Sequence, residues 1–164
     1  METIDQKMFL GGVRRLMEEV YLGFERPDGT WITENEPWSG FLGQLRDLSA
    51  SEASSPIGYP DDASIAGHTN HLRYSLNLAN RAFRGENAYE NADWDGSWVV
   101  REVSDDEWRT LLAELETEYR NLVPLLSPGE LWSNARMLTG VVGLVAHGAW
   151  HLGAIRQMIH ALRG

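Results

Sequence analysis

The chain has 164 residues, the length of one domain, and its 24 acidic and 14 basic side chains give it a formal net charge of −10. Such an acidic chain, with scattered Lys and Arg, disfavours nucleic acid and anionic membranes as partners. It contains no cysteine, which excludes disulfides, a cysteine nucleophile and thiolate metal ligands. We therefore expect a single domain over residues 1–164. Because no signal-peptide pattern is visible at the N-terminus, we expect a cytoplasmic location.

Apolar residues that recur every three or four positions predict four long helices. The first helix is expected over about residues 3–25. Its buried face is expected to contain Phe9, Val13, Leu16, Val20 and Phe24. The stretch 27–60 is rich in Gly, Pro, Ser and acidic residues, so it predicts a long irregular connection with one short helix around residues 41–48.

The second helix is expected over about residues 64–83. Ser64 supplies a capping hydroxyl, and Asp61 and Asp62 add acidic groups before the first turn. Residues 85–103 carry turn-forming residues and two tryptophans, which indicates a loop pinned by its aromatic side chains.

Ser104 opens an S-x-x-E capping box, which predicts the start of a third helix that Pro124 ends. The fourth helix is expected to begin at Leu131 or Ser133 and to end near residue 162. No part of the chain carries a convincing strand pattern. Four amphipathic helices joined by loops predict an all-α fold, namely a four-helix bundle with a long irregular connection between its first two helices.

The segment from Met137 to Ile155 contains no formally charged residue and approaches the length of a membrane span. It also contains four glycines, two histidines and a threonine. A helix buried on most sides by partner helices explains this composition better than a membrane span does. We therefore expect no membrane partner.

The five histidines are the most informative feature of the sequence. His147 and His151 are four residues apart, so a helix places them on one face, and this face is the seam expected to point into the bundle. On the second helix, His68 and His71 both lie within the broad apolar arc. Burying three imidazoles is costly unless each nitrogen finds a partner, and one divalent metal ion would satisfy three of them. His160 is expected to face solvent.

The histidine pattern also excludes two known site types. The pair reads H-G-A-W-H, so it lacks the glutamate of the H-E-x-x-H metalloprotease motif, and no glutamate stands three residues before any histidine, as di-iron bundles require. Three histidines without an obligatory carboxylate leave an open position on a zinc-like or nickel-like ion, which suggests catalysis. The alternative is that each histidine is a core residue bonded to a carbonyl or a water.

Two segments resemble the DinB/YfiT-like superfamily: S-I-A-G-H-T-N-H-L-R-Y-S-L at 64–76 and H-G-A-W-H-L-G-A-I-R-Q at 147–157. Members of that superfamily are four-helix bundles, commonly dimeric, in which one histidine of the second helix and an H-x-x-x-H pair of the fourth bind a divalent metal. The resemblance implies the ligand set His71, His147 and His151, with His71 rather than His68 on the second helix. It also implies a homodimer.

Characterised members of that superfamily include thiol-dependent transferases and isomerases. The resemblance therefore implies a small-molecule substrate and a low-molecular-weight thiol, which must be a cosubstrate because the chain has no cysteine. One alternative is a metal-dependent hydrolase that uses a metal-bound hydroxide. Its candidate catalytic proton-transfer groups are His68, Asn70 and Tyr74, each of which can equally be a packing residue. Another is a non-catalytic, stress-associated dimer that binds the metal.

Overall fold

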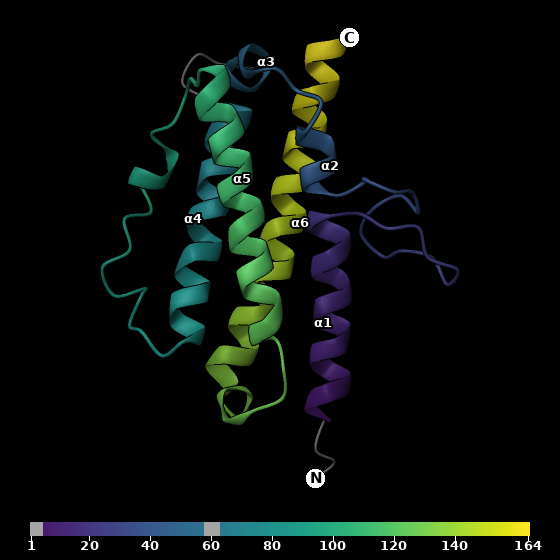
Figure 1. Ribbon diagram of the computed structural model, residues 1–164, viewed down its shortest axis with the longest axis vertical. Coiled ribbons are helices and arrows are strands. Elements are labelled where there is room, and N and C mark those ends of the chain that lie inside the picture. Colours follow the sequence, from purple (N-terminus) through teal and green to yellow (C-terminus); the bar gives the residue numbers. More distant parts are fainter. Residues whose placement is uncertain (1–4, 58–62) are drawn as a thin grey trace.

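Helices are the only regular secondary structure in residues 5–57 and 63–164, the part of the chain that the computed structural model describes (Figure 1). The expected all-α fold is therefore confirmed. The long helices are α1 (Gln6–Tyr21), α4 (Ile65–Phe83), α5 (Asp105–Leu122) and α6 (Ala135–Arg163). The short ones are α2 (Phe41–Leu45), α3 (Ala50–Ser54) and the 3-10 turns η1 (Gly96–Trp98), η2 (Val123–Leu125) and η3 (Glu130–Ser133).

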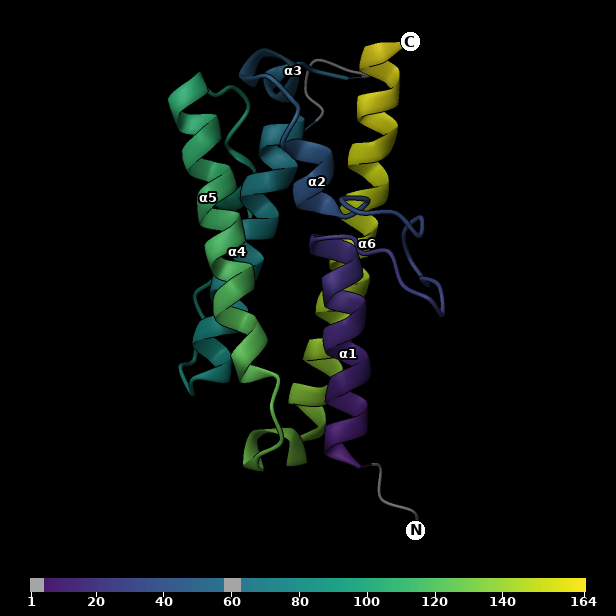
Figure 2. The same ribbon diagram turned by 45° about the vertical axis from the view of Figure 1, so that its right-hand side comes forward.

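The long helices run side by side, and α4 contacts both α5 and α6, whereas α1 packs on α6 (Figure 2). Each of them sends large apolar side chains into one hydrophobic core, where burial of apolar surface stabilises the fold. The core includes Met17 of α1, Leu76 of α4, Leu115 of α5 and Ile155 of α6, all of them fully buried. This packing brings α4 and α6, the two helices that carry histidine pairs, into direct contact.

Helix α1 is shorter than the expected 3–25. Its N-cap is Asp5, whose carboxylate accepts the Lys7 N–H at 2.8 Å, and residues 3 and 4 lie outside the described residues. The expected C-terminal end is wrong, because the helix stops at Tyr21 and the chain turns at Gly23 with φ +73°. A Cβ at Gly23 would meet the Gly40 nitrogen at 2.3 Å, so backbone packs on backbone there. Phe24 lies beyond the helix and is exposed, not part of the core.

The connection between α1 and α4 is held by a buried carboxylate. Glu19 is fully buried, and its Oε2 accepts the backbone N–H groups of Trp31 and Ile32 at 2.8 and 3.1 Å. Helix α2 lies within the short helix expected at 41–48. Helix α3 was not expected, although its capping box of Ser49 and Glu52 is an S-x-x-E signal in the sequence.

The two capping residues expected for α4 and α5 are confirmed. The Ser64 hydroxyl accepts the Gly67 N–H at 3.2 Å, whereas Asp61 and Asp62 lie outside the described residues. Ser104 and Glu107 form both hydrogen bonds of the predicted capping box, and α5 ends just before the turn that contains Pro124. Ser64 also holds the end of the loop 85–103 at the start of α4, because its hydroxyl donates to the Arg101 carbonyl at 2.8 Å.

Helix α6 begins at Ala135, later than expected, because Asn134 has an extended backbone and its side chain caps the Arg136 N–H. A Cβ at Gly148 would meet Val20 Cγ1 at 2.8 Å and the Tyr21 hydroxyl at 3.3 Å, so this glycine permits the close approach of α1. By length and composition α6 could cross a membrane. The core helix of a soluble protein passes the same test, so one such helix is weak evidence for a membrane span.

Candidate metal centre

The four histidines His68, His71, His147 and His151 meet at the contact between α4 and α6. His68 and His71 are one turn apart on α4, and His147 and His151 are one turn apart on α6, so each helix presents two imidazoles on one face. The ligand nitrogens of His71, His147 and His151 all lie within 4.8 Å of one another, and these three residues can hold a metal ion. This is the ligand set that the family resemblance implied.

The nitrogens that converge are the Nε2 atoms. His147 Nε2 lies 3.2 Å from His71 Nε2 and 3.0 Å from His151 Nε2. Zinc bonds to imidazole nitrogen are about 2.1 Å long, so a tetrahedral site needs ligand nitrogens about 3.4 Å apart. The observed spacing is close to that value, and a small outward movement of the rings would accommodate an ion.

The hydrogen bonds of Ser97 determine the tautomer of His71. The Ser97 hydroxyl donates its one hydrogen to the Trp94 carbonyl at 2.5 Å, so it must accept the hydrogen of His71 Nδ1, which lies 2.6 Å away. His71 therefore carries its proton on Nδ1, and its Nε2 presents a lone pair to the other two imidazoles. This is the form in which a histidine binds a metal through Nε2.

His147 and His151 have neutral partners on their Nδ1 atoms as well. His147 Nδ1 lies 3.3 Å from the Ser75 hydroxyl, and His151 Nδ1 lies 2.9 Å from His68 Nδ1. His68 is thus outside the three-histidine cluster and behind His151. In the described part of the chain, no carboxylate is hydrogen-bonded to any of the four imidazoles.

Burial keeps these histidines neutral. His151 is fully buried, and His68 and His71 are nearly so. Desolvation lowers the pKa of His68 to about 4, and desolvation with the neighbouring imidazoles lowers the pKa of His71 to about 4. Burial also lowers the pKa of His147 and of His151. At neutral pH the cluster therefore offers lone pairs and carries no charge of its own.

Tryptophans of the loop 85–103 and of α6 flank the cluster. The Trp98 ring stacks on His71 at 4.1 Å between centroids and with 21° between planes, and it lies 5.6 Å from the His151 ring. Trp150 meets His151 edge-on at 4.7 Å. The loop pinned by aromatic side chains is thus part of the site, because it supplies both Trp98 and Ser97.

Asn70 and Tyr74, two of the candidate proton-transfer groups, bond to the loop. The Asn70 side chain donates to the Ser97 carbonyl at 2.8 Å, and the Tyr74 hydroxyl accepts the Asp93 N–H at 2.8 Å. Both residues hold the loop against α4, whereas the third candidate, His68, contacts His151 directly.

Neither Ser75 nor Ser97 was predicted from the sequence as a residue of the site. Ser75 follows His71 by one helical turn, and this spacing was an available signal. Ser97 lies in the 3-10 turn η1 within the loop 85–103, where no sequence motif marks it as a partner of a histidine.

No protein-family model, curated protein or solved structure matches this chain.

Proposed function

We propose that this protein is a metal-dependent enzyme of the DinB/YfiT-like type, a four-helix bundle in which His71, His147 and His151 hold one divalent transition metal ion, zinc or nickel. The convergence of three Nε2 atoms from two helices, at 3.0 and 3.2 Å, carries the proposal. Imidazole nitrogen suits both metals. Three protein ligands leave a position for substrate, as in catalytic rather than structural zinc sites.

We propose that the reaction uses a low-molecular-weight thiol for transfer or isomerisation. A divalent ion with three neutral imidazole ligands lowers the pKa of a bound thiol or water towards neutrality. In a transfer, the thiol proton leaves to solvent, sulfur bonds to an electrophilic carbon, and the leaving group departs with its bonding electron pair. A nucleophile whose proton leaves to solvent needs no separate carboxylate base, and among the described residues no carboxylate is hydrogen-bonded to the three imidazoles.

The chain's own residues would fix the ligands and shape the site. Ser97 holds the Nδ1 hydrogen of His71 and so keeps its Nε2 available. Trp98 stacks against His71 and excludes water from that side of the cluster. Because the three imidazoles are neutral ligands, they would leave the full charge of the ion available to stabilise an anion.

We further propose a homodimer located in the cytoplasm, without nucleic acid or membrane partners. The net charge of −10 supports the exclusion of nucleic acid. Val142 and Trp150 are large apolar side chains exposed on α6, and a second copy of the chain would cover them.

Metal binding is tested first, by titrating chelator-treated protein with zinc and with nickel and by elemental analysis after dialysis. Wild-type protein is expected to bind one equivalent. His71→Ala, His147→Ala and His151→Ala are each expected to lose stoichiometric binding. His160→Ala is the matched control, because this histidine lies on α6 but is exposed. Full metal occupancy in the three site variants would refute the ligand assignment.

The reaction class is tested next with the metal-loaded protein. Electrophilic substrates are offered with and without a panel of low-molecular-weight thiols. Product that forms only when a thiol is present supports thiol-dependent transfer or isomerisation. Turnover without any thiol would refute it and favour the metal-dependent hydrolase. Stoichiometric metal with a fourth protein ligand would instead favour a non-catalytic dimer.

A further inference from the structure

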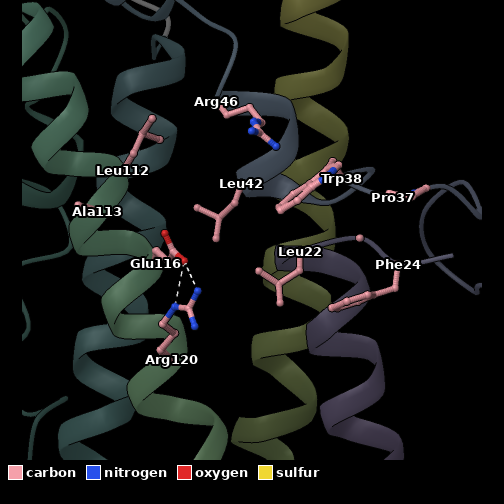
Figure 3. Close-up of a pocket in the computed structure, with 11 residues that line it drawn as sticks. Leu22, Phe24, Pro37, Trp38, Leu42, Arg46, Leu112, Ala113, Glu116 and Arg120 are labelled. Atoms are coloured by element: carbon pink, nitrogen blue, oxygen red, sulfur yellow. Dashed lines mark hydrogen bonds and ion pairs between the residues drawn. The ribbon is translucent and has the colours of Figure 1, made fainter.

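A groove lies between α5, α2 and the C-terminal end of α1 (Figure 3). It has a volume of about 580 Å³, within the range of pockets that bind small molecules. Leu22, Leu42 and Leu112 form its apolar lining. None of the four clustered histidines lines it, so the groove is separate from the candidate metal centre.

The wall formed by Trp38 is built by close backbone packing. A Cβ at Gly43 would meet the Trp38 carbonyl oxygen at 1.9 Å, and a Cβ at Gly40 would meet the Gly23 nitrogen at 2.5 Å. Trp38 has φ +64°, the one positive value among the non-glycine residues that the structure describes. This conformation is unfavourable for a bulky side chain and persists only where its surroundings hold it in place. It presents the half-exposed indole ring at the groove.

Two arginines line the groove, and their surroundings differ. Arg120 of α5 is neutralised by Glu116, to which its Nε and one terminal nitrogen donate at 2.9 and 2.5 Å. Arg46 instead lies over the Trp38 ring, with its guanidinium carbon 4.6 Å from the ring centre. Its carboxylate neighbour is Asp47 at 3.9 Å, too far for a hydrogen bond. Arg46 is thus the cation of the groove whose donors remain available to a ligand.

We propose that this groove binds a small amphipathic carboxylate, whose apolar body lies among the leucines and whose charged end pairs with Arg46. A planar guanidinium donates two parallel hydrogen bonds to a carboxylate. Stacking on Trp38 leaves the edge of the guanidinium, which carries the donors, free to do so. Because Arg120 is neutralised by Glu116, Arg46 is the charged group of the groove lining that an anionic end of a ligand can pair with.

The proposal is tested by titrating the whole protein with decanoate. Calorimetry measures the affinity, and amide chemical shifts locate the bound ligand. Decanoate is expected to bind and to shift amides of α2 and of the α5 turn around Ala113. Arg46→Gln is expected to weaken decanoate binding about fivefold, the upper range for a partly exposed ion pair. It should leave the affinity for the uncharged 1-decanol unchanged. Arg109→Gln removes a cation of α5 outside the groove and should change neither affinity.

A second variant tests the position of the ligand. Ala113 lines the groove and is exposed, so Ala113→Trp fills the space without disturbing the core, and its unfolding transition should match the wild type. It is expected to abolish binding of both decanoate and 1-decanol. Decanoate binding in His147→Ala should equal the wild type, which separates this groove from the metal centre. No binding by wild-type protein, or equal binding by Arg46→Gln or Ala113→Trp, would overturn the proposal.

Discussion

His68 Nδ1 lies 2.9 Å from His151 Nδ1, so an imidazole stands where metal-binding histidines usually have a carboxylate, a carbonyl or a water. One of these two nitrogens must carry the proton. If His151 binds a metal through Nε2, its Nδ1 is the donor and His68 Nδ1 is the acceptor. His68 is then a positioning residue, which holds the His151 ring in its metal-binding tautomer.

This arrangement predicts that His68→Ala weakens zinc binding about tenfold without abolishing it, the size of effect that partners behind a metal ligand commonly have. His68→Asn should recover most of the affinity, because its amide oxygen offers an acceptor at about the place of Nδ1. Competition with a chromophoric chelator measures both. Equal zinc affinity in wild-type and His68→Ala protein would show that His68 has no positioning role.

The two serines behind the cluster, Ser97 and Ser75, are expected to differ in their contributions to stability and metal binding. Ser97→Ala leaves the His71 Nδ1–H without its partner at 2.6 Å and the Trp94 carbonyl without its partner at 2.5 Å. The expected cost is about 1–3 kcal/mol of unfolding free energy, together with weaker zinc binding. Ser75→Ala should cost less on both measures, because its hydroxyl lies 3.3 Å from His147. Urea unfolding and zinc titration test the order, and a larger effect of Ser75→Ala would contradict it.

The buried histidines predict how stability of the metal-free protein depends on pH. The pKa of His68 and of His71 is about 4 in the folded protein, below the unfolded value of about 6.5. Between these values the unfolded chain binds more protons than the folded one, so stability present above pH 6.5 is lost as the pH falls towards 4. The melting temperature of chelator-treated protein should therefore fall between pH 7 and 5.

A competing effect of pH makes this window informative. Lowering the pH also reduces the repulsion within a chain of net charge −10, an effect of opposite sign. Carboxylates with a lowered pKa, such as Glu52 and Glu107, lose their contribution mainly below pH 5, so a fall in melting temperature between pH 7 and 5 is expected from groups that burial holds neutral. The double variant His68→Asn, His71→Asn should have a flatter profile. A melting temperature that is constant or rises in the wild type would contradict the assignment of buried, neutral histidines.

Two glycines of α6 should respond in opposite directions to alanine. At Gly148 a Cβ would meet Val20 Cγ1 at 2.8 Å, so Gly148→Ala should destabilise the protein by about 1–3 kcal/mol through overpacking. At Gly153 a Cβ would meet nothing within 4 Å. Gly153→Ala should stabilise it by about 0.5–1 kcal/mol, because alanine favours a helix over glycine. Urea unfolding of both variants at one pH checks the prediction, and shifts of the same sign would contradict it.

Much of the helical structure was predictable because it depends on neighbours in the chain. Ser64 and Ser104 cap α4 and α5 through contacts three residues away. The pair His147 and His151 shares a face because a helix turns once in 3.6 residues. The choice of His71 over His68 came from the family resemblance, and the clustering of the ligand nitrogens agrees with it.

By itself, the amino-acid sequence determined the approximate positions of the four long helices and which imidazoles share a face, because both follow from interactions within one or two turns. Only the tertiary structure decided that α1 stops at Tyr21, since the close contact of Gly23 with Gly40 joins residues far apart in the chain. It also decided that Ser97 selects the tautomer of His71 and that His68 lies behind His151. These contacts depend on how loops and helices pack, and no local pattern encodes that packing.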